Sequence, residues 1–299
     1  MITQKLSVVV PVFNSESTLT ILVESALKLD FVGELILVDD GSSDGSWGQL
    51  QSLVQRHSGV VAIKLSRNFG QHNALLAGIR HAKHEVIATL DDDLQNPPEE
   101  LPKLINALTE DVDVVYGLPI KKSESIARRI PSFLMKKSYG ILLGVPSAPM
   151  ISPFRVFRSS LREGFSSNGL GPNVSIDSLL SWSTTRFSSV RIEHRPRQIG
   201  KSNYSVAKLV RLALDTLTTY TTKPLRIASL VGAVIGITTL VNHLLFRISP
   251  ANFQSPNVIP PILAILLIIS TLSEYVARIH NRVMGKPSYV VASIIQGQA

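Results

Sequence analysis

Two long apolar runs near the end of the chain restrict its fold more than any other feature. Residues 227–246 are nearly all apolar, and residues 258–277 form a second run with Glu274 near its end. Each run has about 20 residues, the length of an α-helix that crosses the core of a bilayer. A buried helix in a soluble protein is the alternative, but such helices are seldom so long and so uniformly apolar. The pattern predicts two transmembrane helices within residues 225–280.

Basic residues on the outer sides of the two runs predict their orientation. Lys223 and Arg226 precede the first run, and Arg278, Arg282 and Lys286 follow the second. The link between the runs carries Arg247 as its one basic residue. Cytoplasmic flanks of membrane helices are enriched in Lys and Arg. We therefore expect an integral membrane protein with two spans, whose outer flanks and globular domain lie in the cytoplasm.

The charge of the chain is unevenly distributed. The 299 residues carry a net charge of +8, and the part after residue 185 has thirteen basic and three acidic residues, a net +10. A nucleic-acid-binding protein more often concentrates basic residues on its globular domain. Here they flank apolar segments, which favours a membrane surface and phosphorylated ligands over nucleic acid. A merely solvated basic face is the alternative. The absence of cysteine excludes disulfides, thiolate metal sites and a cysteine nucleophile.

Short apolar runs alternate with amphipathic stretches in the first half of the chain. The runs, rich in Val, Ile and Leu, are residues 6–12, 35–38, 60–65 and 86–90, and the stretches of helical length are residues 16–29, 44–56 and 71–83. Strands that alternate with helices predict an α/β, Rossmann-like domain with a mostly parallel sheet. Ligands of such sheets bind beyond the carboxyl ends of the strands. We expect this domain to cover residues 1–205.

Two basic amphipathic stretches and a terminal segment complete the expected organisation. We expect residues 206–224 to form a juxtamembrane helix, and residues 125–143, which contain Arg128 and Arg129, to be similar in character. Such helices lie in the headgroup plane of a membrane or pack as ordinary surface helices, and the pattern leaves both open. Residues 281–299 are expected to be a cytoplasmic tail.

An acidic triplet follows the fourth apolar run. Successive side chains of a strand alternate in direction, so we expect Asp91 and Asp93 to point the same way and Asp92 to point away. Two carboxylates at a strand end, extended by the amide of Gln95, provide hard oxygen ligands for Mg²⁺ or Mn²⁺. An exposed turn is the alternative, because Asp is common in turns.

Three further clusters follow predicted strands or precede the apolar runs. Asp39 and Asp40 begin a Gly- and Ser-rich segment that suits a base or ribose, or that caps a helix through Ser43 or Asp44. Arg67 lies at a strand-to-helix turn. Residues 195–204 form a glycine-containing loop that suits a diphosphate or a lipid phosphate, and a merely solvated loop is the alternative. The polar residues of this loop are Arg195, Arg197, Lys201, Ser202 and Tyr204.

The combination of these motifs resembles the family 2 glycosyltransferases, which have the GT-A fold. The segments that carry the resemblance are residues 10–14, 38–46 and 91–99. The chain is most similar to the polyprenyl-phosphate branch of this family, which contains bactoprenol glucosyltransferases and dolichol-phosphate mannosyltransferases. The segments that match this branch are residues 65–70, 200–204, 274–278 and 285–289. The resemblance covers nearly the whole chain.

The resemblance implies a role for each matching residue. Asp91, Asp93 and Gln95 would bind the metal and the donor diphosphate, and basic or hydroxyl residues of the 195–204 loop, with Arg128 and Arg129, would meet phosphates. The residues expected around the nucleotide are Pro11, Phe13, Glu16, Asp39, Asp40, Arg67 and Asp92. The sequence departs from the branch in three places. Residues 200–204 read Gly-Lys-Ser-Asn-Tyr in place of Gly-acid-Ser-Lys-Tyr, and residues 118–120 lack an arginine that branch members often have. The stretch 146–153 is also atypical. The acceptor or the sugar is therefore expected to differ.

The function implied is the inverting transfer of a sugar from a nucleoside-diphosphate donor, with UDP favoured, to a polyprenyl phosphate. Undecaprenyl phosphate in a bacterial inner membrane is the expected acceptor, and copies of the chain are expected to associate through the spans. Asp177 stands about where relatives that glycosylate hydroxyls keep a catalytic acid, or it is a first-turn acid favoured by a helix dipole. A phosphate acceptor is already ionised at neutral pH, so we expect Asp177 not to be an essential base.

Two other functions fit the same motifs. One is a glycosyltransferase that extends a lipid-linked or cell-surface glycan. The other is a membrane-tethered protein that binds nucleotide sugars without catalysis, against which the Asp91 and Asp93 pair argues. A processive synthase is disfavoured because the sequence has no Gln-x-x-Arg-Trp motif.

Overall fold

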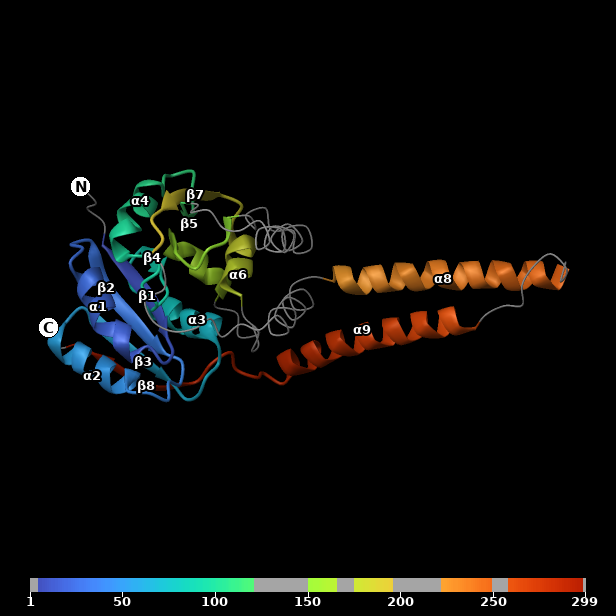
Figure 1. Cartoon of the computed structure of the whole chain (residues 1–299), viewed down its shortest axis with the longest axis horizontal. Helices are drawn as coiled ribbons and strands as arrows, with labels where there is room; N and C mark the ends of the chain where they lie inside the picture. Colours follow the sequence, from blue (N-terminus) through green and yellow to red (C-terminus); the bar gives the residue numbers. More distant parts are fainter. Residues whose placement is uncertain (1–4, 121–149, 166–174, 196–221, 249–257, 298–299) are drawn as a thin grey trace. The chain divides into compact units, whose positions relative to one another are not determined.

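A computed structural model describes residues 5–120, 150–165, 175–195, 222–248 and 258–297. The chain divides into two compact units (Figure 1). The first contains Met1–Tyr204 together with Lys286–Ala299, and the second contains Ser205–Gly285.

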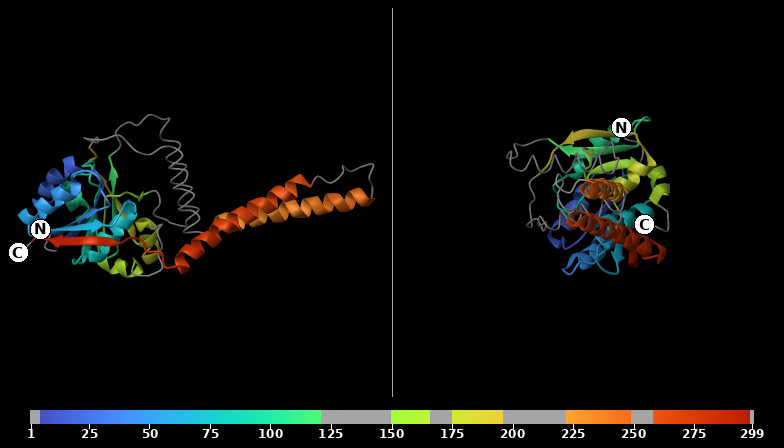
Figure 2. Two further views of the ribbon diagram at one scale, coloured as in Figure 1. Left: turned by 90° about the horizontal axis from the view of Figure 1, so that it is seen from below. Right: turned by 90° about the vertical axis from the view of Figure 1, so that its right-hand side faces the viewer.

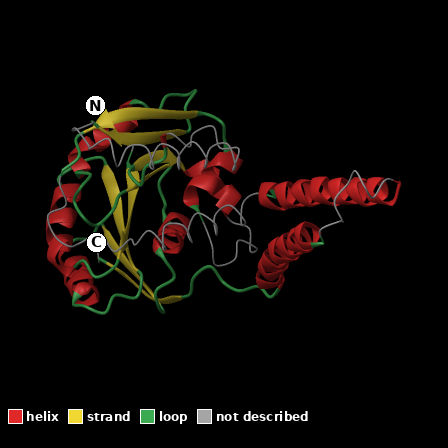
Figure 3. Cartoon of the chain, turned by 45° about the vertical axis from the view of Figure 1, so that its right-hand side comes forward, coloured by secondary structure: helices red, strands yellow, loops and turns green. Residues whose placement is uncertain are grey.

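The first unit is built on an eight-stranded sheet with the order β7-β5-β6-β4-β1-β2-β3-β8. Figure 3 shows strands of this unit in yellow. Strand β1 pairs in parallel with β2 and β4, and β2 with β3, whereas β6 and β8 run antiparallel to their neighbours. The strands are β1 (Leu6–Val12), β2 (Val32–Asp39), β3 (Val60–Leu65), β4 (Val86–Thr89), β5 (Val114–Pro119), β6 (Arg155–Arg158), β7 (Phe187–Ile192) and β8 (Val291–Gln296). The predicted α/β architecture with a mostly parallel sheet is confirmed.

Helices cover both faces of this sheet, which explains why the central strands β1 and β4 are buried along their whole length (Figures 1 and 2). Helices α1 (Glu16–Leu27), α2 (Ser46–Arg56) and α4 (Leu101–Asn106) contribute to one core, with Val8 and Val10 of β1. Helices α3 (Gln71–His81), η3 (Ser159–Phe165) and α6 (Ile176–Ser183) contribute to the other, with Val9. The short η1 (Pro98–Glu100) leads into α4.

Strand β8 is a feature that the sequence pattern did not predict. Residues 281–299 were expected to be a separate tail, but Val291–Gln296 pair with β3 at the edge of the sheet. The β-branched residues of this segment suit a strand, and pairing satisfies the backbone groups that β3 would otherwise expose. The first unit is therefore assembled from both sides of the apolar runs.

The second unit consists of two long helices, α8 (Lys223–Ile248) and α9 (Ile259–Val283). Gly232 of α8 allows close packing, because a Cβ at this position would lie 2.4 Å from Cδ1 of Ile268. Both helices are long and apolar enough to cross a membrane. Only 6% of the most apolar 18-residue stretch of each helix is buried. Residues 206–221 of the expected juxtamembrane helix and the stretch 125–143 lie outside the described residues.

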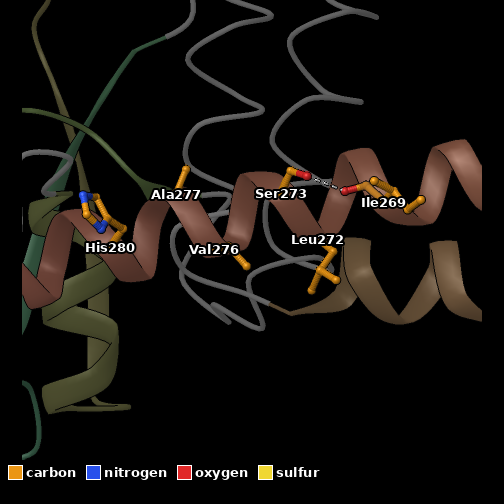
Figure 4. Close-up of a pocket in the computed structure, with 6 residues that line it drawn as sticks. All are labelled: Ile269, Leu272, Ser273, Val276, Ala277 and His280. Atoms are coloured by element: carbon orange, nitrogen blue, oxygen red, sulfur yellow. Dashed lines mark hydrogen bonds between the residues drawn. The ribbon is translucent and has the colours of Figure 1, made fainter.

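A hollow on α9 is lined by side chains of this helix (Figure 4). Its residues are Ile269, Leu272, Ser273, Val276, Ala277 and His280. The Ser273 hydroxyl donates to the carbonyl oxygen of Ile269 at 2.8 Å, so its hydrogen is used within the helix. The largely apolar lining suits hydrocarbon rather than a nucleotide.

The packing of α3 on the sheet can be tested at Gly78. A Cβ at this position would lie 2.4 Å from Cγ1 of Val9, so Gly78→Ala overpacks the interface. We expect a loss of about 1–3 kcal/mol in the free energy of unfolding, measured by thermal or denaturant unfolding of the solubilised protein. Gly48→Ala is the control, because a Cβ at this exposed position of α2 meets no atom within 4 Å. A Gly78→Ala protein as stable as the Gly48→Ala protein would contradict the packing.

Candidate active site

Four loops meet at the carboxyl ends of β1 to β4. The parallel pairing of β1 with both β2 and β4 places the loops that follow these strands side by side. The loop after β3 joins them because β3 pairs with β2. The residues expected to bind the nucleotide and the metal lie on these loops or at the strand ends. Pro11 is buried in β1, whereas the side chain of Phe13, just after this strand, is 45% exposed.

Asp40 holds the loop after β3 against the loop after β2. Its two carboxylate oxygens accept from the backbone N–H groups of Phe69, at 2.7 Å, and Gly70, at 2.8 Å. Burial raises the pKa of Asp40, although these two bonds oppose the shift. Gly41, with φ of +71°, lies so close to the backbone of Arg67 that a Cβ would be 2.6 Å from its carbonyl carbon. Asp40 thus shapes the loop that carries Arg67, whose guanidinium lies 4.4 Å from the centre of the Phe69 ring.

Asp39 is the better placed of the two carboxylates for an additional hydrogen bond. Its side chain is fully buried, and Oδ1 accepts from the Ser42 N–H at 3.1 Å. Within the described part of the chain, Oδ2 has no hydrogen-bond partner. Unsatisfied buried acceptors are rare in proteins. A ligand or a water that donates an N–H or O–H group to this oxygen would satisfy it.

Glu16 connects the loops after β1 and β2. Its Oε2 accepts from the Gly45 N–H at 3.1 Å, at the start of α2, and its own N–H donates to Asp44. The side chain therefore has a structural partner in this structure, besides the nucleotide contact that the resemblance implies.

The acidic triplet forms a turn instead of continuing β4. The strand ends at Thr89, so the expectation that strand alternation sets the directions of the three carboxylates is wrong. Asp92 accepts from the Phe13 N–H at 3.2 Å and from the Ser15 hydroxyl. Burial raises the pKa of Asp92 and these bonds oppose the shift. Asp92 therefore joins the turn to the end of β1.

Asp91 and Asp93 have different neighbours. Oδ1 of Asp91 accepts from the Gln71 side-chain amide at 2.6 Å, and Oδ1 of Asp93 accepts from the Gln95 N–H at 3.1 Å. Leu94, between Asp93 and Gln95, adopts φ of +60°, a left-handed conformation that is uncommon for a branched residue. The turn is thus held by contacts with β1, with α3 and within itself.

The donor set of this turn fits Mg²⁺ or Mn²⁺. Carboxylates of Asp91 and Asp93 and the amide of Gln95 are hard oxygen ligands. Among the described residues, no three His, Asp or Glu side chains form a metal cage. Mg²⁺ is commonly bound by one or two carboxylates, with substrate phosphates and water as the other ligands. The turn suits a metal that arrives with a diphosphate.

Asp177 lies in a buried ion pair. It is 7% exposed, in the first turn of α6, and its Oδ1 accepts from the Tyr116 hydroxyl at 3.0 Å and from the Arg155 guanidinium. His72 lies nearby, where Nδ1 accepts from the Ile176 N–H at 3.4 Å. Burial lowers the pKa of His72, an effect that the charge of Asp177 opposes. The Tyr116 hydroxyl and the Arg155 guanidinium therefore bind the same oxygen of Asp177.

The loop that leads to the expected phosphate contacts begins against the acidic turn. The Arg195 N–H donates to the Gln95 carbonyl at 2.8 Å, and His194 Nδ1 lies 3.1 Å from Oδ1 of Asn96. The other residues expected to meet phosphates lie outside the described residues: Arg128, Arg129, Arg197, Lys201, Ser202 and Tyr204.

Sequence reasoning did not identify the side chains that hold these groups. Ser15, Gln71, Tyr116 and Arg155 each contact one of the predicted carboxylates. A signal existed for Arg155, which stands as a cation within the apolar run Phe154–Phe157. The other three are ordinary polar residues whose partners are distant in the sequence.

Comparison with known proteins places this arrangement in a family. The model of glycosyl transferase family 2 matches residues 7–165. An undecaprenyl-phosphate 4-deoxy-4-formamido-L-arabinose transferase of Yersinia enterocolitica is 33% identical, over 98% of this chain and 94% of the relative. A protein of the same name from Pseudomonas aeruginosa is also 33% identical, over 97% of this chain and 90% of the relative.

Solved structures resemble the fold. Glucosyl-3-phosphoglycerate synthase of Mycobacterium tuberculosis, in a complex with Mn²⁺, UDP and glucosyl-3-phosphoglycerate, aligns with a TM-score of 0.53 and 18% identity. The alignment covers 73% of this chain and 78% of that one. The same enzyme with Mg²⁺ and UDP gives a TM-score of 0.52. The predicted GT-A fold is confirmed by these similarities.

The role of Asp40 in shaping the site can be tested by Asp40→Asn. An asparagine side chain has one acceptor oxygen, so one of the two N–H groups of Phe69 and Gly70 loses its partner. We expect a loss of about 1 kcal/mol in the free energy of unfolding, because a partly buried donor is left unsatisfied. Asp30→Asn, at an exposed aspartate, is the control and should leave stability within about 0.5 kcal/mol. Equal stabilities of the two variants would contradict this role.

Proposed function

The chain belongs to glycosyltransferase family 2, and from this we propose that it transfers a sugar from a nucleoside-diphosphate donor to undecaprenyl phosphate. The transfer takes place at the cytoplasmic face of a membrane and inverts the configuration at the anomeric carbon. The observation that carries the proposal is the full-length similarity to undecaprenyl-phosphate transferases, which extends through both apolar helices.

The donor diphosphate binds at the acidic turn. Asp91 and Asp93, with Gln95, would hold Mg²⁺ or Mn²⁺, which neutralises charge on the departing nucleoside diphosphate. Asp92 and Asp40 keep the loops after β1, β3 and β4 in place through their hydrogen bonds to backbone and Ser15. The site is therefore organised before the donor arrives, which lowers the cost of orienting it.

A UDP-linked donor is the one we favour. The Oδ2 of Asp39 would accept an N–H of a base or a hydroxyl of the ribose, and the exposed ring of Phe13, which follows the neighbouring strand β1, offers an apolar face to a base. The structurally similar synthase binds UDP and UDP-glucose, and the relatives transfer a formamido sugar. UDP-linked 4-deoxy-4-formamido-L-arabinose is thus the first donor to test.

The acceptor needs no strong base. A phosphate monoester has a second pKa near 6, so undecaprenyl phosphate is largely a dianion at neutral pH. One of its oxygens attacks the anomeric carbon while the bond to the nucleoside diphosphate breaks, and a single displacement inverts the configuration. Asp177 does not take a proton, because Arg155 and Tyr116 already hold its carboxylate. Basic side chains of the 195–204 loop would hold the lipid phosphate in line.

The apolar helices bring the acceptor to the domain. The exposed surfaces of α8 and α9 are dominated by Leu, Ile and Val, which are stable in hydrocarbon but costly to expose to water. The excess of basic residues on the outer flanks of the two helices supports a cytoplasmic position of the domain.

The proposal is tested with purified protein, Mn²⁺, undecaprenyl phosphate and a panel of radiolabelled nucleotide sugars. We expect a labelled lipid product from at least one UDP-sugar. Asp93→Ala should lower kcat/KM by about 100-fold or more, since losing a metal ligand removes several kcal/mol of charge stabilisation.

Asp111→Ala is the matched control, because Asp111 is an exposed aspartate of the loop before β5. It should keep wild-type activity. No lipid product with any donor would refute the acceptor, and a product with a glycan acceptor alone would favour the extending transferase. Binding of nucleotide sugars without turnover would favour the non-enzymatic alternative.

The pH dependence distinguishes a phosphate nucleophile from a base-assisted hydroxyl. We expect kcat/KM for the lipid to rise with pH up to about 6 and then to stay level to about pH 8, as the dianion forms. The measurement is initial rates with saturating donor at constant ionic strength. A rate that continues to rise tenfold per unit above pH 7 would contradict this mechanism.

A further inference from the structure

Arg155 is a cation in the core of the catalytic unit. It begins β6, where it stands opposite Thr89 of β4 and Tyr116 of β5, and its side chain is 1% exposed. Its immediate neighbours in sequence, Phe154 and Val156, are fully buried apolar residues. An unpaired charge in such a position would be very costly, so the partners of Arg155 decide its role.

The guanidinium has two side-chain partners from different elements. Its Nε donates to the Thr89 hydroxyl at 3.0 Å, and Nη1 forms the ion pair with Asp177. Thr89 in turn donates to the Pro153 carbonyl at 2.7 Å. Burial and the charge of Asp177 raise the pKa of Tyr116, so its phenol stays protonated and donates to Asp177. The pair is thus hydrogen-bonded on several sides.

These contacts close a ring that passes through Asp91. Arg155 binds Thr89, two residues before Asp91, and Asp91 accepts from Gln71 at the start of α3. His72, the next residue, accepts from the Ile176 N–H, and Asp177 returns the ring to Arg155. Burial lowers the pKa of Arg155, but the charges of Asp177, Tyr116 and Asp91 and the hydrogen bond to Asp177 together raise it. The charge of Arg155 is therefore felt at Asp91.

Stability alone does not explain a pair of this kind. Replacing a buried ion pair by apolar residues of similar size is often neutral or stabilising, because desolvation of both charges offsets their attraction. The ring instead determines geometry. It ties the end of β4 to the first turns of α3 and α6, and Asp91 lies at the point where these elements meet.

We infer that Arg155 is a positioning residue that holds the Asp91 carboxylate in the orientation required to bind the metal–diphosphate of the donor. The inference rests on the proposed function, because it assumes that Asp91 binds this metal. Asp177 is a positioning residue as well, since it fixes Arg155 and takes no part in proton transfer.

The test is Mn²⁺ binding in the presence of UDP, measured by electron paramagnetic resonance on the purified full-length protein. The main variant is Arg155→Gln with Asp177→Asn, which removes both charges together and leaves neither unpaired. We expect the Kd for Mn²⁺ to rise about 10-fold or more, the range seen when outer partners of metal ligands are removed.

Arg158→Gln is the matched control. Arg158 lies on the same strand, but its side chain pairs with Asp113 at 3.6 Å and donates to the Thr109 carbonyl at 2.8 Å, and neither residue belongs to the ring. The Kd of the Arg158→Gln protein for Mn²⁺ should equal that of the wild type.

A second variant opens the ring without changing the core. Gln71 is exposed, and Gln71→Ala removes its bond to Asp91. This variant should also raise the Kd for Mn²⁺. In a protein that combines Gln71→Ala with the Arg155/Asp177 changes, the Kd should rise by less than the product of the two separate fold-changes, because the ring is already open. Independent structural roles would give multiplicative effects.

The outcomes separate the inference from the function beneath it. A wild-type Kd in a folded Arg155/Asp177 variant, or in Gln71→Ala where the core variant does not fold, would overturn the inference while the proposed function stands. A wild-type protein that binds no Mn²⁺ with UDP would overturn both.

Discussion

The site depends on carboxylates that bind backbone N–H groups of neighbouring loops. In a parallel sheet the strands pair with each other, but the loops at their carboxyl ends have no ladder to hold them together. Asp40 joins the loops after β2 and β3, Asp92 joins those after β4 and β1, and Glu16 joins those after β1 and β2. Burial raises the pKa of Asp40 and Asp92, so the folded protein keeps these charges at a cost in order to place the loops.

The parts of this fold that follow from local pattern were predictable, and the parts that follow from distant pairing were not. Apolar runs identified β1 to β4 because these strands are buried on both faces. Strand alternation failed to predict the acidic turn, since β4 ends at Thr89 and the turn is shaped by contacts with residues 13–15 and Gln71. Strand β8 was missed because its partner, β3, lies more than two hundred residues earlier in the chain.

The same distinction applies to the site residues. Acidic motifs indicated Asp39, Asp40, Asp91 and Asp93, because carboxylates that follow buried parallel strands lie where such sheets bind their ligands. Their division of labour needed coordinates: both oxygens of Asp40 bind backbone, whereas Oδ2 of Asp39 has no partner among the described residues. Asp177 is a further case. An acid in the first turn of a helix suggests a helix-dipole contact or a catalytic role. The ion pair of Asp177 with Arg155 supports neither of these as the main role of Asp177.

The return of the chain to the sheet constrains the number of membrane crossings independently of charge. The segment before α8 belongs to the catalytic unit up to Tyr204, and the segment from Lys286 belongs to it again, with β8 paired to β3. Only Lys286–Val290 separate the second unit from β8. If α8 and α9 each cross the membrane once, both outer ends must emerge on the side that holds the sheet. An odd number of crossings is incompatible with this connection. The basic flanks then indicate which side it is, and the proposed function assigns the sheet and its acidic turn to the cytoplasm.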